Sequence, residues 1–189
     1  MGLDLGHTVS LLSKFAIRTK KLIDKDKEMK DFSVNVFLGK YKIIRFVPGV
    51  RNRFGIYVPI PEGLEVPFNS TTKEIGDIYL KTANNALNHY GEDLDRRTAK
   101  PKYISFKKFK SQKQFNLEHF CFSSFAINGT IKFTFLPWHK NEFCLLKSDI
   151  ECIIEIARTD DKDIIGKAIL DIIEKADKNY PELNILSDK

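Results

Sequence analysis

Apolar and polar positions follow two patterns along the chain, and these patterns alternate twice. Between about residues 33 and 68, and again between 102 and 157, aromatic and β-branched residues alternate or cluster in short runs, which is typical of β-strands. Over residues 75–87 and 164–176 the apolar positions recur at steps of three and four, as on one face of a helix. The chain therefore predicts an α+β fold in which antiparallel strands precede each of two helices.

The two helix-like stretches repeat each other at a fixed offset along the chain (166 − 76 = 90). At that offset Ile75, Gly76, Leu80, Ala86 and Tyr90 correspond to Ile165, Gly166, Leu170, Ala176 and Tyr180. A glycine inside a helix costs roughly 0.5–1 kcal/mol relative to alanine. Its presence at equivalent places near the first turn of both helices predicts that each helix approaches the sheet closely.

A repeat of this length predicts two similar halves, each a set of strands closed by one helix. We expect one domain over residues 32–189, with halves at about 32–91 and 101–180. Apolar residues of the stretch 9–23 fall near one helical face, so residues 1–31 are expected to form an N-terminal helical extension.

Local signals predict where the helices begin. Thr71 and Glu74 have the spacing of a capping box, in which the hydroxyl and the carboxylate each accept from a main-chain amide of the first turn. The second helix is expected to begin near Asp160 or Asp161, because acidic side chains are favoured at the positive end of a helix.

Turns and strands are predicted in the same way. Pro48-Gly49 indicates a turn, and Asn128-Gly129 suits a two-residue hairpin turn because both of its positions need positive φ. We expect strands over residues 103–109 and 115–127, and a loop over residues 137–141 that carries the only tryptophan.

Composition indicates a globular protein of 189 residues with 42% hydrophobic and 30% charged residues. No run of eighteen apolar residues exists, so we expect no membrane span. The three cysteines, an odd number without tight spacing, argue for free thiols in a reducing compartment: Cys121, Cys144 and Cys152. With no secretory signal pattern at the N-terminus, a cytoplasmic location is expected.

The net charge of +6 comes from one segment, residues 96–117. This basic segment holds eight basic and no acidic residues: Arg96, Arg97, Lys100, Lys102, Lys107, Lys108, Lys110 and Lys113. The rest of the chain carries 23 basic residues (31 − 8) against 25 acidic ones. Such a segment favours nucleic acid or an acidic protein as partner.

Aromatic and basic residues interleave over Tyr103 to Lys110, which leaves three interpretations open. An exposed strand of this kind can stack bases and attract phosphates. It can also be a charged edge strand that discourages unwanted pairing, or a protein-binding surface. The pair Trp138-His139 is either an aromatic anchor of an interface or a loop that folds back over the core.

The chain shows no pattern typical of catalysis or of a bound cofactor. No glycine-rich phosphate loop is present, and His119 and Cys121 together supply too few ligands for a zinc site. A Cys–His nucleophile would also need an orienting group and an oxyanion site, which the sequence does not identify. We therefore expect no metal, no cofactor and no enzymatic activity.

The segments 72–80 (TKEIGDIYL) and 160–170 (DDKDIIGKAIL) resemble immunity proteins of bacterial contact-dependent growth inhibition systems. The resemblance covers about residues 33–176. It implies a cytoplasmic, non-catalytic protein that binds and blocks a toxin domain, often a nuclease, delivered by a neighbouring cell. Some members are similar to the Whirly fold, with two four-stranded sheets each followed by a helix. In part of the family, the toxin pairs a β element with an edge of the immunity protein.

The expected function is thus neutralisation of a cognate toxin C-terminal domain by occlusion, on a duplicated, Whirly-like α+β scaffold. The candidate toxin-binding residues are Lys107, Lys108, Lys110, Trp138 and His139. The alternative is a single-stranded nucleic-acid-binding protein on the same scaffold.

Overall fold

The computed structural model describes residues 30–186, except residues 53, 91, 93, 95–105, 107, 108, 140, 141, 145, 147, 148 and 150. The strands are β1 (Phe32–Gly39), β2 (Ile43–Arg51), β3 (Tyr57–Pro59), β4 (Leu64–Pro67), β5 (His119–Ile127), β6 (Thr130–Leu136), β7 (Trp138–His139), β8 (Glu142–Phe143) and β9 (Ile153–Ala157). The helices are α2 (Thr72–Asn88), α3 (Gln112–Leu117) and α4 (Lys162–Asn179), and a 3-10 turn, η2, spans Pro181–Leu183. The predicted helix within residues 1–31 lies outside the described residues.

Seven of these strands form one antiparallel sheet in the order β3–β2–β1–β5–β6–β9, with β4 also paired to β2. Strands β1 and β5 join the two predicted halves, with Phe37 opposite Cys121. The predicted α+β class is confirmed, but the strands of both halves share one continuous sheet and do not form one sheet per half. Pairing β1 with β5 removes the two unpaired edges that separate sheets would leave at these strands. A Whirly-like duplication is not established by this sheet.

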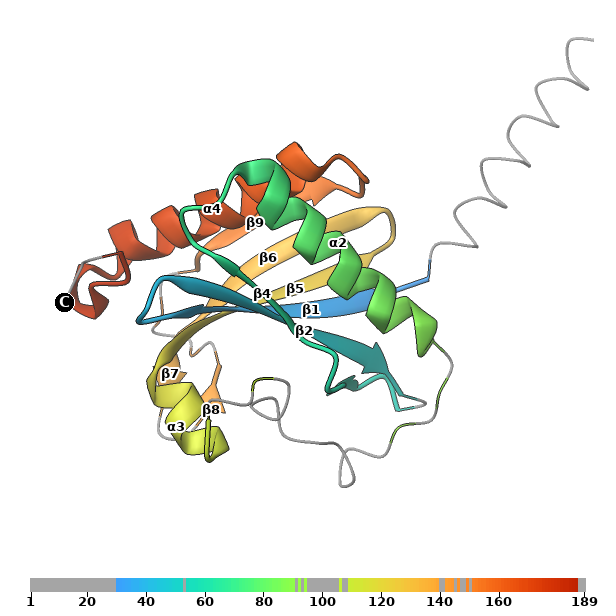
Figure 1. Ribbon diagram of the computed structural model, residues 1–189, viewed down its shortest axis with the longest axis horizontal. Helices are drawn as coiled ribbons and strands as arrows, with labels where there is room; N and C mark the ends of the chain where they lie inside the picture. Colours follow the sequence, from blue (N-terminus) through green and yellow to red (C-terminus); the bar gives the residue numbers. More distant parts are fainter. Residues whose placement is uncertain are drawn as a thin grey trace, which may run out of the picture. The chain divides into compact units, whose positions relative to one another are not determined.

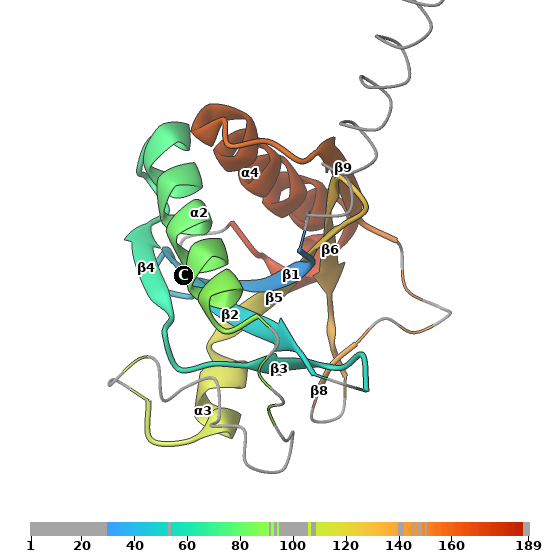
Figure 2. The same ribbon diagram turned by 90° about the vertical axis from the view of Figure 1, so that its right-hand side faces the viewer.

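The helices α2 and α4 lie side by side on one face of the sheet, and α3 lies on the other face (Figures 1 and 2). The main core fills the space between the sheet and the two long helices. Its largest fully buried members include Phe46, Ile75, Tyr79, Phe122, Phe133, Phe135 and Ile165. A second cluster on the α3 face contains Phe37, Val47, Phe106, Phe115 and Cys121.

Both long helices begin where the local signals predict. Thr71 caps α2 by accepting from the Glu74 amide, and the Glu74 carboxylate accepts in turn from the Thr71 amide. The carboxylate of Asp161 caps α4 by accepting from the amides of Asp163 and Ile164. The capping box and the acidic helix start are therefore confirmed, because each depends only on residues within one helical turn.

The repeated glycines lie where the two helices meet each other. A Cβ atom added to Gly76 would come within 1.9 Å of the Lys162 carbonyl oxygen, and one added to Gly166 within 1.9 Å of the Thr72 carbonyl oxygen. The contact is reciprocal at the same offset as the sequence repeat (162 − 72 = 90). The predicted close packing is confirmed, but its partner is the other helix and not the sheet.

Most other repeated positions also have equivalent surroundings. Ile75 and Ile165 are fully buried. Ala86 and Ala176 are also buried, with at most 2% of their surface exposed. Tyr90 and Tyr180 differ, with 48% and 8% of their surface exposed. The repeat therefore corresponds to equivalent burial at the isoleucine and alanine positions but not at the tyrosines.

The predicted turn at Pro48-Gly49 is wrong, because both residues lie within β2, opposite Val34 and Ser33 of β1. The Pro48 carbonyl accepts from the Ile60 amide at 3.0 Å, on the side of β2 away from β1. The N–H and C=O of one strand residue point to the same side, so the missing N–H of proline also falls there. Pro48 therefore removes no main-chain hydrogen bond between β2 and β1.

The hairpin turn at Asn128-Gly129 is confirmed. The φ angles are +50° and +76°, which is the left-handed pair that a two-residue turn between β5 and β6 requires.

Three other predictions of local structure need correction. The predicted strand 115–127 begins as helix α3, capped by Ser111, and becomes strand only from His119. Phe106 and Phe109, the described residues of the predicted strand 103–109, belong to no strand. The predicted loop 137–141 contains β7, which pairs with β8. In the first two cases contacts with the α3 face of the sheet prevail over local strand propensity. In the third, pairing with β8 makes part of the predicted loop a strand.

Candidate functional site

The structure describes some of the predicted site residues and not others. Lys107 and Lys108 lie outside the described residues, and His139 is described only as the main-chain partner of Glu142 in the β7–β8 pair. Lys110 lies one residue before Ser111, the N-cap of α3, and its amide donates to the Gln114 side chain at 3.1 Å. Trp138 lies in β7.

Trp138 lines a pocket of about 420 Å³ next to the C-terminal end of α3. Apolar side chains from several elements surround it, including Leu117, Phe120, Phe143 and Leu183, and Lys40 lies among its lining residues. The Trp138 ring meets the Phe143 ring edge-on at 4.9 Å between centroids. The tryptophan thus both packs on a neighbour and borders a hollow large enough for a partner's apolar side chain. The two interpretations of Trp138 are therefore compatible.

The aromatic members of the interleaved stretch turn inward at the described positions. Phe106 is 5% exposed and stacks on Phe115 at 5.9 Å between ring centroids. Phe109 meets the same ring edge-on at 5.1 Å. Base stacking requires exposed aromatic faces, so Phe106 is not available for it.

A buried arginine on the α3 face was not found by sequence reasoning. Arg45 of β2 is 2% exposed, and its Nε lies 3.1 Å from a carboxylate oxygen of Glu65, the opposite residue on β4. Its guanidinium also lies over the rings of Phe106 and Phe109, at 5.5 and 5.2 Å from their centroids. Burial is the main cause that lowers the pKa of Arg45 from its ordinary value. This side chain therefore ties the chain that precedes α3 to the sheet.

Arg45 also determines the state of His119. Its Nη1 lies 2.8 Å from His119 Nε2, and since a guanidinium only donates, Nε2 accepts. The proton is then on Nδ1, which donates to the Phe115 carbonyl at 2.5 Å. Burial lowers the pKa of His119 to about 4, so the ring is neutral at pH 7.

This geometry bears on the His119 and Cys121 pair considered from the sequence. The two residues alternate with Phe120 on β5, but both ring nitrogens of His119 are engaged elsewhere. Across the described part of the chain, no group of three or more His, Cys, Asp or Glu side chains is arranged to hold a metal ion. Cys121 and Cys152 are buried, Cys144 is half-buried, and none of the three forms a disulfide.

The outer edge of the sheet at β9 presents main-chain groups. The Arg158 amide donates to Gly129 and the Cys152 carbonyl accepts from Phe135, so the even-numbered positions point toward β6. The alternating positions 153, 155 and 157 therefore point away from β6. Lys175 donates to the Ile153 carbonyl at 3.0 Å. Among the residues described, the outward groups of Glu155 and Ala157 have no hydrogen-bond partner.

The opposite edge of the sheet, formed by β3 and β4, is built differently. Prolines stand at the ends of both strands and between them: Pro59, Pro61 and Pro67. Proline cannot donate a main-chain hydrogen bond and discourages pairing with a further strand. The edge at β9 is therefore better suited to accept a strand from a partner.

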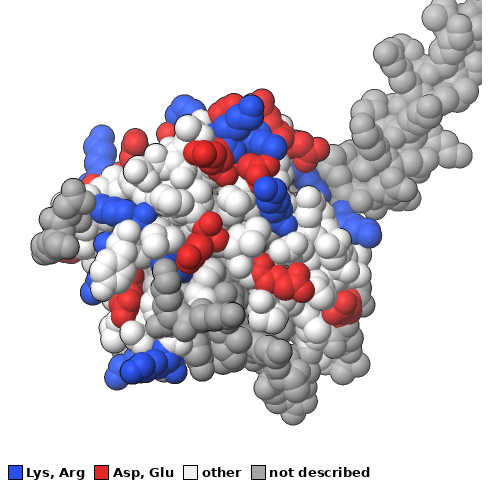
Figure 3. Space-filling model, viewed as in Figure 1, with Lys and Arg blue, Asp and Glu red and all other residues white. Residues whose placement is uncertain are grey.

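The outer surface of α2 and α4 carries both signs of charge, interspersed in Figure 3. Asp77 lies 2.5 Å from Lys162 and 2.7 Å from Lys81, and these hydrogen bonds lower the pKa of the Asp77 carboxyl to about 2. Thr72 donates to Asp163 across the helix crossing at 2.7 Å. Such a mixed surface does not attract a partner of one charge. Of the helices described, none is long and apolar enough to cross a membrane.

The chain matches no protein-family model and no curated protein. Among solved structures it is similar to NMB0488, a protein of unknown function from Neisseria meningitidis, with a TM-score of 0.53 and 11% identity over 77% of this chain and 95% of that one. It is also similar to a chain of the CdiA-CT/CdiI toxin and immunity complex from Yersinia pseudotuberculosis, with a TM-score of 0.52 and 12% identity over 76% of this chain and 98% of that one. At these identities the likeness shows a shared fold.

Proposed function

We propose that this protein is a non-catalytic immunity protein of the cytoplasm, which binds the C-terminal domain of a cognate growth-inhibition toxin and blocks it. The fold shared with a chain of a toxin and immunity complex supports this proposal. So does the resemblance of the segments 72–80 and 160–170 to such proteins. Co-expression with the candidate toxin domain tests it: growth should be rescued, and continued killing would contradict it.

The observation that carries the mechanism is the outward-facing main chain of β9. A β element of the toxin that pairs with Glu155 and Ala157 would gain main-chain hydrogen bonds, and neighbouring side chains would select the partner. The pocket beside Trp138 offers a second place for partner contact. Neither contact requires a chemical step, which agrees with the proposed inhibition by occlusion.

Blocking the edge tests this mechanism. We expect Glu155→Pro to weaken binding of the toxin domain at least tenfold, or about 1.4 kcal/mol. The substitution removes an amide that points away from β6, so the ladder between β6 and β9 keeps its hydrogen bonds. Isothermal titration calorimetry would measure the affinity, and circular dichroism would verify the fold.

The matched control is Glu155→Gln, which removes the charge but keeps the amide. Glu155 pairs with Lys132 at 3.5 Å on an exposed surface, and such pairs contribute little. Binding should therefore equal that of the wild type. Equal affinity of Glu155→Pro and the wild type would remove β9 from the interface.

The basic segment supplies a separate prediction about charge. We propose that it faces an acidic region of the toxin, because complementary charge speeds encounter and rejects wrong partners. Charge reversal of Lys107 and Lys110 to glutamate should weaken toxin binding at least tenfold, with the larger share in the association rate. Stopped-flow association kinetics would measure it, and an unchanged rate would exclude both lysines from the interface.

The alternative function is binding of single-stranded nucleic acid on a Whirly-like scaffold, which the eight basic residues of the basic segment favour. Retention on a single-stranded oligonucleotide that weakens steeply with salt would support it, because phosphate contacts release counterions. Absence of retention at low salt would leave toxin binding as the remaining proposal.

A further inference from the structure

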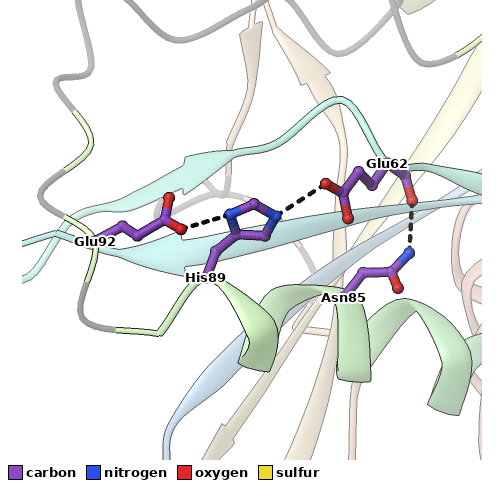
Figure 4. Close-up of polar contacts among 4 residues, drawn as sticks. All are labelled: Glu62, Asn85, His89 and Glu92. Carbon is purple, nitrogen blue, oxygen red and sulfur yellow. Dashed lines mark hydrogen bonds and ion pairs between the residues drawn. The ribbon is translucent and has the colours of Figure 1, made fainter.

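His89, at the C-terminal end of α2, lies between two carboxylates (Figure 4). Its Nδ1 is 2.9 Å from Glu92, which follows the helix, and its Nε2 is 2.9 Å from Glu62, in the loop between β3 and β4. Asn85, one turn earlier on α2, donates to the Glu62 main-chain carbonyl at 3.2 Å. One ring thus joins a helix end, a loop at the edge of the sheet and the chain that leaves the helix.

The geometry requires a protonated ring. An ionised carboxylate only accepts hydrogen bonds, so both ring nitrogens must donate, and only the imidazolium form does so. Loss of a proton would leave one nitrogen lone pair facing a carboxylate at 2.9 Å. The hydrogen bond with Glu92, and then that with Glu62, raise the pKa of His89 above its ordinary value.

The end of α2 also favours a positive charge at this place. The last turn of α2 contains no basic residue, and the unpaired carbonyls there carry partial negative charge. Protonated His89 is the cap residue and complements them. Glu62, Glu92 and this helix end are the charged features that face the ring in the described part of the chain.

The ring lies at the beginning of the connection between the two halves. The Glu92 amide donates to the His89 carbonyl at 3.1 Å, and the Leu94 amide donates to Glu92 at 3.0 Å. The Leu94 carbonyl accepts from Asn52, the residue that follows β2, at 3.3 Å. The chain then continues in sequence into the basic segment, which begins at Arg96.

We propose that His89 is a pH-sensitive latch, which in its protonated form fastens the chain leaving α2 to the β3–β4 loop. The folded-state pKa is raised, so the stabilisation is complete below the unfolded value of about 6.5 and is lost as the pH rises through the folded value. The latch is therefore closed below about pH 6.5 and opens as the pH rises through the folded-state pKa. An effect on partner binding through the basic segment rests on the proposed function.

The first experiment needs no partner. A pH titration of the His89 ring by NMR should give a pKa above that of His89 in the double variant Glu62→Gln, Glu92→Gln. Hydrogen exchange at the Glu92 and Leu94 amides, corrected for intrinsic rates, should accelerate at least threefold between about pH 6 and pH 9, a range that brackets histidine titration. In His89→Gln this acceleration should be absent. Equal His89 pKa values, or equal acceleration in His89→Gln, would overturn the proposal.

Lys81→Gln is the matched control, because Lys81 is an exposed charge on the same helix that pairs with Asp77 and not with His89. It should retain the behaviour of the wild type in both measurements. Once the toxin domain is purified, the affinity of the wild type for it should depend more on pH than the affinity of His89→Gln does. Equal dependence would overturn the regulatory effect, whereas no binding at any pH would overturn the proposed function and leave the latch standing.

Discussion

Gly76→Ala is expected to destabilise the protein by about 3 kcal/mol, the upper end of the usual cost of overpacking. The new Cβ would stand 1.9 Å from the Lys162 carbonyl oxygen, and it would also crowd the carbonyl carbon at 2.7 Å. These are main-chain atoms in the first turn of α4, so they cannot turn aside as a flexible side chain would. Relief requires α2 and α4 to separate, which opens the main core. Equilibrium unfolding in urea would measure the loss.

Gly166→Ala should behave in the same way, because its Cβ would meet the Thr72 carbonyl oxygen at the same distance of 1.9 Å. The matched control is Gly49→Ala in β2, where the nearest atom to the new Cβ is Ser33 Cβ at 3.5 Å, an ordinary contact. Gly49 has no positive φ, so alanine there should be neutral or slightly stabilising. Wild-type stability of Gly76→Ala would refute the helix crossing.

The second large effect is expected at Arg45. Arg45→Ala should cost about 3 kcal/mol, the low end for a broken buried ion pair, because Glu65 is 41% exposed and can be rehydrated. The substitution also leaves His119 Nε2 without its donor and removes the cation from the rings of Phe106 and Phe109. Urea unfolding and proteolysis near Phe106 would measure the loss of stability and of order.

Arg51→Ala is the control for Arg45, since it removes the same residue type from the same strand. Arg51 is 50% exposed and lies 3.3 Å from Asp31, so its ion pair is worth less than about 1 kcal/mol. Arg45→Met would separate the effect of the lost charge on stability from the effect of the lost side-chain volume, because methionine refills part of the space. Equal costs of Arg45→Ala and Arg51→Ala would show that the buried network does not stabilise the protein.

Both predictions concern the scaffold that supports the proposed binding surface. The helix crossing fixes the long helices over the sheet, and Arg45 fixes the chain before α3 against the opposite face. Loss of toxin binding in these variants would follow from loss of fold. Only Glu155→Pro and the lysine reversals therefore test the interface itself.

Sequence reasoning succeeded where the determining contacts lie within a few residues. Thr71 and Glu74 satisfy each other within one turn, and Asn128-Gly129 needs only its own backbone angles. It failed at Pro48-Gly49 because the pairing of β2 with strands on both sides decides that segment. Of the candidate site, Trp138 was found as a lone tryptophan, whereas the pairing of Arg45 with His119 joins residues 74 positions apart. The sequence signal that could have identified Arg45 was a charged residue between two apolar ones, Ile44 and Phe46.

The chain alone determined the α+β class, the starts of both long helices and the repeated glycines, because periodicity and capping act over short distances. The tertiary structure decided that seven strands from both halves form one sheet, that the glycines serve a crossing of two helices and that β9 is an outer edge of that sheet among the described residues. Those outcomes depend on which surfaces meet after the chain folds back on itself. Contacts between strands and helices that are far apart in the chain leave no pattern in the sequence over the length of one helical turn or one strand.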